Sequence, residues 1–163
     1  MAYEGAYRCA VLTPTRELFA GDIYYADIPG YAGHYGVVKN HESLVATNHQ
    51  GGKLTIWLDP EGNEKKVFLV HRGCSQMLNN HLAILCRFGC PADEIDVDKV
   101  KAKIERLTAT LEEHRASLAQ IEAEGDEDRL AAEKAWIDTE EIHLSWYEAQ
   151  VDWAENGRES TKQ

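Results

Sequence analysis

The hydrophobic pattern of this chain changes once, near Pro91, and this change constrains the fold more than any other feature. Before Pro91, short runs rich in Val, Ile, Tyr, Phe and Thr alternate with turn residues, as is typical of β-strands. After it no proline occurs, and apolar residues recur at alternating spacings of three and four, as on one face of a helix. The sequence therefore predicts an α+β protein with a β-domain at residues 1–90, a helical domain at 91–155 and a tail at 156–163.

The β-domain is predicted from many short strands that follow one another with no helical pattern between them. Pro60 and Gly62 suit a tight turn, Asn79 and Asn80 suit a two-residue turn, and HRG at residues 71–73 is predicted to be a third turn. Such a series predicts an antiparallel sandwich or barrel. The strand-like runs are residues 7–13, 22–28, 34–38, 43–47, 53–58, 66–70, 75–78 and 82–88.

Two helices joined by a short acidic turn are predicted after Pro91. On the first helix, apolar residues form a heptad seam that only His114 interrupts, and Asp93 or Asp96 can cap its start. Gly125 interrupts the pattern, and a second helix follows over about residues 129–153. The two amphipathic helices should fold back on each other as an antiparallel hairpin. Three tryptophans widen the apolar face of the second helix and are predicted to pack the hairpin: Trp136, Trp146 and Trp153.

The formal net charge is −11, and all of the excess acid lies in the helical half. Up to Cys90 the chain has 8 acids and 8 bases, whereas from Pro91 onward it has 20 acids and 9 bases. Nucleic-acid phosphates require a basic surface, so nucleic-acid binding is not expected. No apolar run approaches the ~20 residues of a membrane helix. The N-terminus lacks the basic and apolar stretches of a secretory leader, so we expect the chain to stay in the compartment where it is made.

The stretch PGYAGHYGVVKNH, residues 29–41, is the candidate site, because it holds three glycines and two histidines. It suits a phosphate loop, a metal site, or a series of tight turns that shapes a surface for another protein. Its glycines match neither GxxxxGK[ST] nor GxGxxG, and the histidines of the chain do not pair as HxH, HxxxH or HExxH. The four cysteines form no CxxC pair. We therefore expect neither catalytic residues nor a metal site, and we expect a binding protein.

Several short motifs occur in a characteristic order: VLTP at 11–14, FAG at 19–21, PG at 29–30, GVVKNH at 36–41 and IDVDKV at 95–100. This ordered set, over about residues 7–155, resembles the epsilon subunit of F-type ATP synthase. The resemblance implies a β-sandwich of about ten strands followed by a two-helix hairpin. It also implies a non-catalytic rotor subunit of the central stalk, which couples proton flow through the membrane c ring to ATP synthesis. In that family the hairpin can regulate ATP hydrolysis.

The resemblance implies partners and contact residues as well. The chain is expected to bind the gamma subunit and the c ring, and the catalytic alpha and beta subunits when its hairpin extends. The sequence leaves open whether the hairpin is folded down or extended. His34, His41 and Glu42 are expected to contact the c ring. As a peripheral subunit, the protein is expected at the cytoplasmic face of the bacterial cell membrane.

The chain departs from the family pattern at positions that bear on function. His34 stands where a carboxylate is common in the family. One stretch, which here begins at Ile95 and Asp96, is linked to ATP binding in some members. Lys99 and Val100 replace an Arg and an Ala there, so we expect no bound ATP and no other cofactor. Family helices meet an acidic segment of the catalytic subunits through basic residues, so the acidic hairpin predicts weak or absent inhibition.

Two other functions remain open on the residues alone. A non-catalytic β-sandwich adaptor with a protein-binding helical hairpin would bind a partner but would not comigrate with a membrane ATPase. A small enzyme would use the scattered cysteines and histidines, and metal analysis of the purified protein would reveal it.

Overall fold

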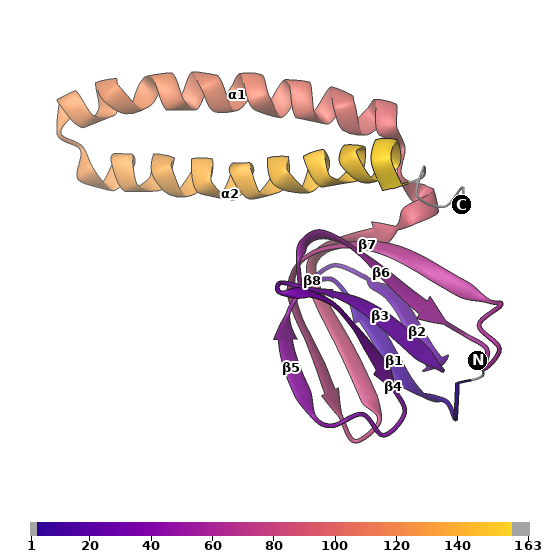
Figure 1. Cartoon of the computed structure of the whole chain (residues 1–163). Helices are drawn as coiled ribbons and strands as arrows, with labels where there is room; N and C mark the ends of the chain where they lie inside the picture. Colours follow the sequence, from indigo (N-terminus) through magenta and orange to yellow (C-terminus); the bar gives the residue numbers. More distant parts are fainter. Residues whose placement is uncertain (1–2, 158–163) are drawn as a thin grey trace. The chain divides into compact units, whose positions relative to one another are not determined.

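The computed structural model describes residues 3–157, which form two units (Figure 1). The first unit runs to Ile95 and contains the β-strands, and the second begins at Asp96 and contains both long helices. Of the tail predicted at 156–163, residues 158–163 lie outside the described residues.

The strands of the first unit form one continuous sheet, in the order β2-β1-β8-β7-β6-β3-β4, with β5 paired to β7. The sheet folds over on itself into two layers around a core, so the predicted β-sandwich is confirmed. β1 and β8 pair in parallel, which the antiparallel prediction did not anticipate, and the other pairs are antiparallel. The strands are β1 (Tyr7–Leu12), β2 (Glu17–Ile23), β3 (Tyr25–Gly30), β4 (Gly33–Val38), β5 (Leu44–Thr47), β6 (Gln50–Trp57), β7 (Lys65–Leu78) and β8 (His81–Pro91).

The long strand β7 takes part in both layers. Its first half pairs with β6, its second half pairs with β5, and β8 runs beside it over most of its length. The change of partner falls at Arg72 and Gly73, whose φ angles are 57° and 107°. The backbone at this bend is hydrogen-bonded to the β5–β6 connection: the Arg72 amide donates to His49 O at 3.2 Å, and the Asn48 amide donates to Gly73 O at 3.0 Å.

The prediction of about ten strands is wrong, because the structure has eight strands within residues 3–157. HRG at 71–73 is not a turn but the bend inside β7, where His71 and Gly73 pair with β8 in the same register on either side of Arg72. Conversely, the run predicted at 22–28 as one strand contains a break: it holds the end of β2 and the start of β3, which are separated by Tyr24. Glycine at 73 therefore marks a close backbone approach rather than a chain reversal.

Successive side chains along each strand point to opposite faces of the sheet, and those on the inner face form the core between the two layers. Tyr7, Cys9 and Val11 of β1 point inward and are buried, and the same alternation places Leu82 and Ile84 of β8 in the core. Each large apolar side chain that is buried in this way stabilises the fold by about 1.5–3 kcal/mol. The buried hydroxyl of Tyr7 donates to Val37 O at 2.8 Å, which satisfies the polar end of the ring.

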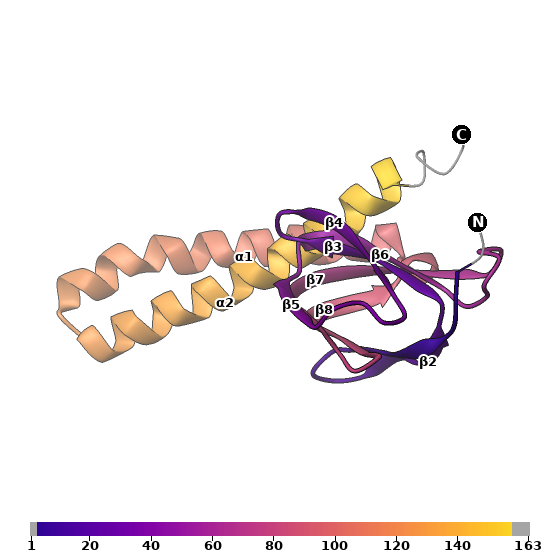
Figure 2. The ribbon, with the colours of Figure 1, turned by 60° about the horizontal axis from the view of Figure 1, so that its bottom comes forward.

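The second unit is a helical hairpin of α1 (Val97–Glu124) and α2 (Glu127–Asp152), which confirms the predicted hairpin (Figure 2). Asp96 caps α1 by accepting a hydrogen bond from the Lys99 amide, and Gly125 ends it with φ 74°. Asp126 then caps α2 by accepting from the Arg129 amide at 3.0 Å. A short 3-10 helix, η1 (Ala92–Glu94), precedes α1, and a π-helical turn, η2 (Trp153–Gly157), follows α2.

Candidate partner-binding surface

The middle of the outer face of the layer formed by β5, β7, β8, β1 and β2 carries no charged side chain. In β1 the residues that alternate with the core point outward, namely Arg8, Ala10 and Leu12. The strand register continues two rows of such residues across the sheet. We call these nine residues the uncharged face: Val45, Gln76, Ala83, Ala10 and Ala20 in one row, and Thr47, Cys74, Leu85 and Leu12 in the next.

The uncharged face has the character of a surface that a partner covers. Val45 is 72% exposed and Leu85 is 44% exposed, although sheets with one face in water normally place polar side chains there. Three of its residues, Ala10, Ala20 and Ala83, have short side chains, so a flat partner surface can approach the backbone there closely. Charges lie at its border, where Arg8 and Asp22 form an ion pair at 3.7 Å and Glu17 of β2 pairs with Leu12 at the end of the second row. A contiguous apolar patch with a polar rim marks a protein interaction site.

The residues predicted to contact the c ring lie along one edge of the sheet, because β4 is the edge strand. His34 is near the start of β4, and its Nδ1 lies 3.0 Å from Asp27 Oδ2 on β3. His41 and Glu42 follow the other end of β4, and His41 Nδ1 lies 2.8 Å from Glu42 O. The structure therefore does not bring His34 and His41 together, since a six-residue strand of about 20 Å separates them.

The turn that holds His41 is fixed to the β7–β8 turn. The Asn40 amide donates to Asn80 Oδ1 at 2.7 Å, and Asn80 Nδ2 donates back to Asn40 Oδ1 at 3.1 Å. Both residues have positive φ, 64° and 60°, which asparagine tolerates. At the other end of β4, Tyr31 is 75% exposed at the tip of the β3–β4 turn. Both ends of this edge therefore present ordered turns for contact.

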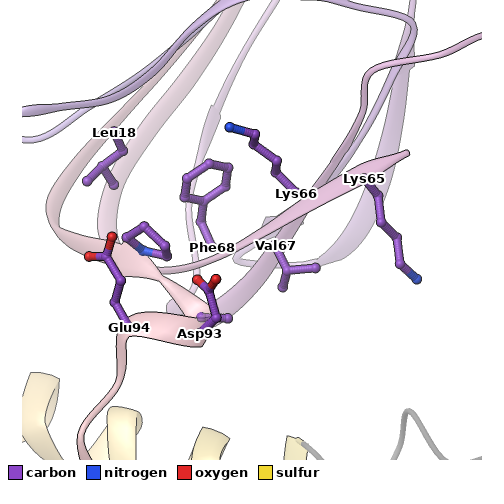
Figure 3. Close-up of a pocket in the computed structure, with 9 residues that line it drawn as sticks. Leu18, Lys65, Lys66, Val67, Phe68, Asp93 and Glu94 are labelled. Atoms are coloured by element: carbon purple, nitrogen blue, oxygen red, sulfur yellow. The ribbon is translucent and has the colours of Figure 1, made fainter. Parts of the chain in front are cut away.

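A pocket of about 520 Å³ lies in the first unit (Figure 3). Its apolar residues include Leu18 and Phe68, and the carboxylates of Asp93 and Glu94 also line it. Two lysines complete it, so its lining has both signs of charge. Glu94 is paired with Arg16 at 3.2 Å, which engages one of the two carboxylates. The lining contains no histidine, serine or cysteine.

Three of the four cysteines, Cys9, Cys86 and Cys90, do not supply reactive thiolates. Burial raises the pKa of Cys9 and of Cys86 to about 12, and burial raises the pKa of Cys90 to about 11. Thiols with such pKa values stay protonated near neutral pH and are poor nucleophiles. Within residues 3–157, no group of three metal-ligating side chains is assembled.

The residues considered for ATP binding have structural partners at the start of α1. Asp96 Oδ1 accepts from the Lys99 amide at 3.2 Å, and Asp96 Oδ2 lies 2.7 Å from Lys99 Nζ. Ile95 is buried. Asp96 thus serves as a helix cap, and the exposed Lys99 ammonium pairs with its carboxylate.

The three tryptophans predicted to pack the hairpin have different surroundings. Trp136 stacks on the imidazole of His114 across the hairpin, with ring centroids 3.9 Å apart. Trp146 is buried, and Trp153 is half-buried where α2 passes into the π-helical turn.

Sequence reasoning missed the uncharged face. The signal that could have found it is the alternation in YRCAVL and HLAILC, where small or apolar residues occupy the outward positions as well. Ala10, Ala83 and Leu85 are not strongly polar, so they did not mark a solvent face. The cross-strand register that gathers them comes only from the structure.

The fold defines the class of the protein, a β-sandwich followed by a helical hairpin. Residues 6–91 match the family model described as ATP synthase, Delta/Epsilon chain, beta-sandwich domain. The ATP synthase epsilon chain of Sulfurihydrogenibium sp. (strain YO3AOP1) is 33% identical over 111 residues, 68% of this chain and 81% of that relative. The ATP synthase epsilon chain of Persephonella marina (strain DSM 14350 / EX-H1) is 32% identical over 117 residues, which cover 71% of this chain and 84% of that relative. The chain therefore belongs to the ATP synthase delta/epsilon chain family, whose members are non-catalytic subunits.

A solved structure agrees on the fold. A chain of the Euglena gracilis mitochondrial ATP synthase, solved as an OSCP/F1/c-ring assembly, superposes with a TM-score of 0.53 at 20% identity. The superposition covers 91% of this chain and 81% of the Euglena chain, so it includes the hairpin as well as the sandwich. Between residues 3 and 157, no helix has the length and apolar character needed to cross a bilayer.

Proposed function

We propose that this chain is a central-stalk rotor subunit of a proton-translocating F-type ATP synthase, coupling proton flow through the c ring to ATP synthesis. Family membership carries the proposal, and the uncharged face supplies the docking surface that such a subunit requires. The subunit acts by binding and by transmitting force, and its place is at the cytoplasmic face of a bacterial membrane, peripheral and held through the complex.

The uncharged face is the surface proposed to pack against the gamma subunit. The uncharged face is broad, is flat where the alanines lie and has exposed apolar side chains at Val45 and Leu85. The centre of a stable protein interface has the same character. Its central contacts are fully removed from water only when a partner is seated, so a charge placed there costs several kcal/mol of binding.

The edge strand β4 and its two turns are proposed to contact the c ring. His34 lies at one end of this edge, and His41 and Glu42 lie at the other. Exposed edges and turns of this kind offer unpaired backbone groups and side chains to a neighbour. Because the two ends are separated, each is expected to make its own contact, and single substitutions at His34 and His41 should act independently.

The hairpin is proposed to inhibit ATP hydrolysis weakly or not at all. Its half of the sequence has 20 acids and 9 bases, so it is poorly suited to an acidic segment on the catalytic subunits. Deleting residues 92–163 in the assembled enzyme should change the rate of ATP hydrolysis by less than about twofold. A large activation by the deletion would contradict this part of the proposal.

The experiment that tests the function is a pulldown of the tagged chain from detergent-solubilised membranes of its host. The gamma and catalytic subunits should copurify with the wild-type chain. Leu85→Asp, which places a charge in the uncharged face, should reduce their recovery at least tenfold, about 1.4 kcal/mol. Ala119→Asp, on the exposed side of α1, is the matched control and should keep full recovery. Recovery of a partner other than ATP synthase subunits would favour the adaptor function instead.

A further inference from the structure

The apolar seam of the hairpin contains one polar layer. On α1 the buried seam residues are Val100, Leu111 and Ile121, and His114 occupies the seam position one turn after Leu111. A polar residue at such a position usually lowers the stability of the helix pair and makes its pairing more specific. What His114 contacts on α2 therefore decides what the layer does.

The contacts of His114 come from both helices. Its Nδ1 lies 2.5 Å from Glu133 Oε1 on α2, and Ser117 Oγ on α1 donates to the same carboxylate oxygen at 3.2 Å. The imidazole stacks on the indole of Trp136, with an angle of 27° between the ring planes. The side chains of His114 and Glu133 are only 37% and 20% exposed, so solvent screens their interaction incompletely.

We propose that this layer is a proton-sensitive latch: protonation of His114 strengthens the packing of α1 on α2. An imidazolium makes a charge-assisted hydrogen bond to the Glu133 carboxylate, which is stronger than the bond from a neutral ring. A positive ring is also attracted to the face of the Trp136 indole. Both partners are on α2, so both gains are lost when the helices separate. The packed hairpin thus binds the proton more tightly, and by linkage the proton favours the packed hairpin.

The two arginines near this layer have carboxylate partners of their own. Glu113 and Arg129 line the same small pocket of about 280 Å³, and Arg129 Nη1 is 2.9 Å from Glu124 Oε2. On the neighbouring turn Arg115 Nη2 is 2.5 Å from Glu141 Oε1. Both arginines thus pair with carboxylates other than Glu133. The carboxylates named here outnumber the two arginines, so a protonated His114 would add positive charge to a layer that has an excess of negative charge.

The direction of the pH effect follows from the charge. Free histidine titrates near pH ~6.5, so the extra stabilisation is present at about pH 6 and is lost as the pH rises to about 8. His143 and Glu140 form a second histidine–carboxylate pair at 3.3 Å, but both residues belong to α2. Because the two residues of that pair are on one helix, His143, which lines a pocket with Lys103 and Arg106 of α1, provides a matched control.

Hydrogen exchange of the full-length chain, corrected for the intrinsic pH dependence of exchange, tests the latch. Amides on either side of the layer, around Leu111 and Ile137, should be about tenfold better protected at pH 6 than at pH 8. His114→Gln and Glu133→Gln should each remove this difference, whereas His143→Gln should keep it. His114→Leu should give a hairpin that is well protected at both pH values, because it completes the apolar seam.

The latch is refuted if wild-type protection is the same at pH 6 and pH 8, or if Glu133→Gln keeps the full difference. If the His114→Leu variant keeps the pH dependence of protection, a group other than His114 causes it, and the proposal is likewise overturned. Helical circular dichroism of each variant checks that the hairpin has formed. The inference concerns the hairpin itself and does not depend on the proposed partners.

Discussion

The sandwich and the hairpin are held together in different ways. The sandwich has equal numbers of acids and bases, a core enclosed between two layers, and strands paired across long sequence separations. The hairpin has one apolar seam, a polar layer at His114 and an excess of acid. The family model covers the sandwich and ends at residue 91, before the hairpin begins. The stability of the sandwich thus rests on apolar packing, which pH changes little. The stability of the hairpin depends on a few polar contacts, which pH and charge can strengthen or weaken.

The largest expected effect comes from breaking the sandwich at its bend. A Cβ on Gly73 would lie 1.9 Å from Leu85 O, and the φ of 107° is itself unfavourable for other residues. Gly73→Ala should destabilise the sandwich by about 4 kcal/mol or more, enough to unfold much of it. Gly33→Ala is the control, since φ is 128° there but a Cβ meets nothing within 4 Å. Urea unfolding, monitored by far-UV circular dichroism, measures the free energy of unfolding of both variants. If the two substitutions destabilise the sandwich equally, the clash with Leu85 O does not contribute.

The next effect compares the same truncation in the two units. Leu54 is fully buried in the sandwich and Leu111 is buried in the hairpin seam. Leu54→Ala and Leu111→Ala should each cost about 2–4 kcal/mol, by loss of burial and by the cavity left behind. Hydrogen exchange should show that Leu111→Ala increases opening of the hairpin and leaves the sandwich amides protected. A uniform loss of protection in both units would show that they unfold together.

A smaller effect is expected at the turn between the helices. Asp126 Oδ1 accepts a hydrogen bond from the Arg129 amide, so Asp126→Ala should destabilise α2 by about 1 kcal/mol. Asp128→Ala, also in the first turn of α2 but not at the cap position, should have a smaller effect. Thermal unfolding of the hairpin in the two variants tests this, and an equal loss would point to the helix dipole rather than the cap.

The smallest effect is expected in acid at the start of α1. Hydrogen bonds from the Lys99 side chain and amide lower the pKa of Asp96. A lowered pKa means that Asp96 stabilises the helix start above the ordinary carboxyl range and loses that effect as the pH falls below about 4. This is opposite in sign to the His114 latch, which gains as the pH falls toward 6. Exchange of the first-turn amides of α1 should therefore increase below pH 4, and Asp96→Asn should blunt this increase.

The hairpin could be predicted in detail because its signals are local. Asp96, Gly125 and Asp126 cap and separate the helices through contacts with residues three positions away or fewer. The partner of His114 could not be predicted in the same way. Which residue of α2 faces it depends on the register of the hairpin, which tertiary packing sets.

The sandwich could be predicted as a class but not as a topology. Alternation shows which side of a strand faces the core, but it does not name the neighbouring strand. The parallel pairing of β1 with β8 and the pairing of β5 with β7 arise from contacts far apart in sequence. Gly73 was misleading because glycine usually signals a turn, whereas here β8 and the β5–β6 connection satisfy the bent backbone. The uncharged face escaped prediction for the same reason, since the register that assembles it is not local.

The sharing of β7 by both layers has a mechanical consequence. In a sandwich of two separate sheets, a load applied to one sheet reaches the other only through side-chain contacts, which slide under shear. Here the covalent backbone of β7 runs through the bend at Arg72 and Gly73 from one layer into the other. A sideways force on the uncharged face is therefore carried along the chain itself into the layer that contains β4. For a proposed rotor subunit, that continuity makes the sandwich a stiff link between whatever grips one layer and whatever touches the other.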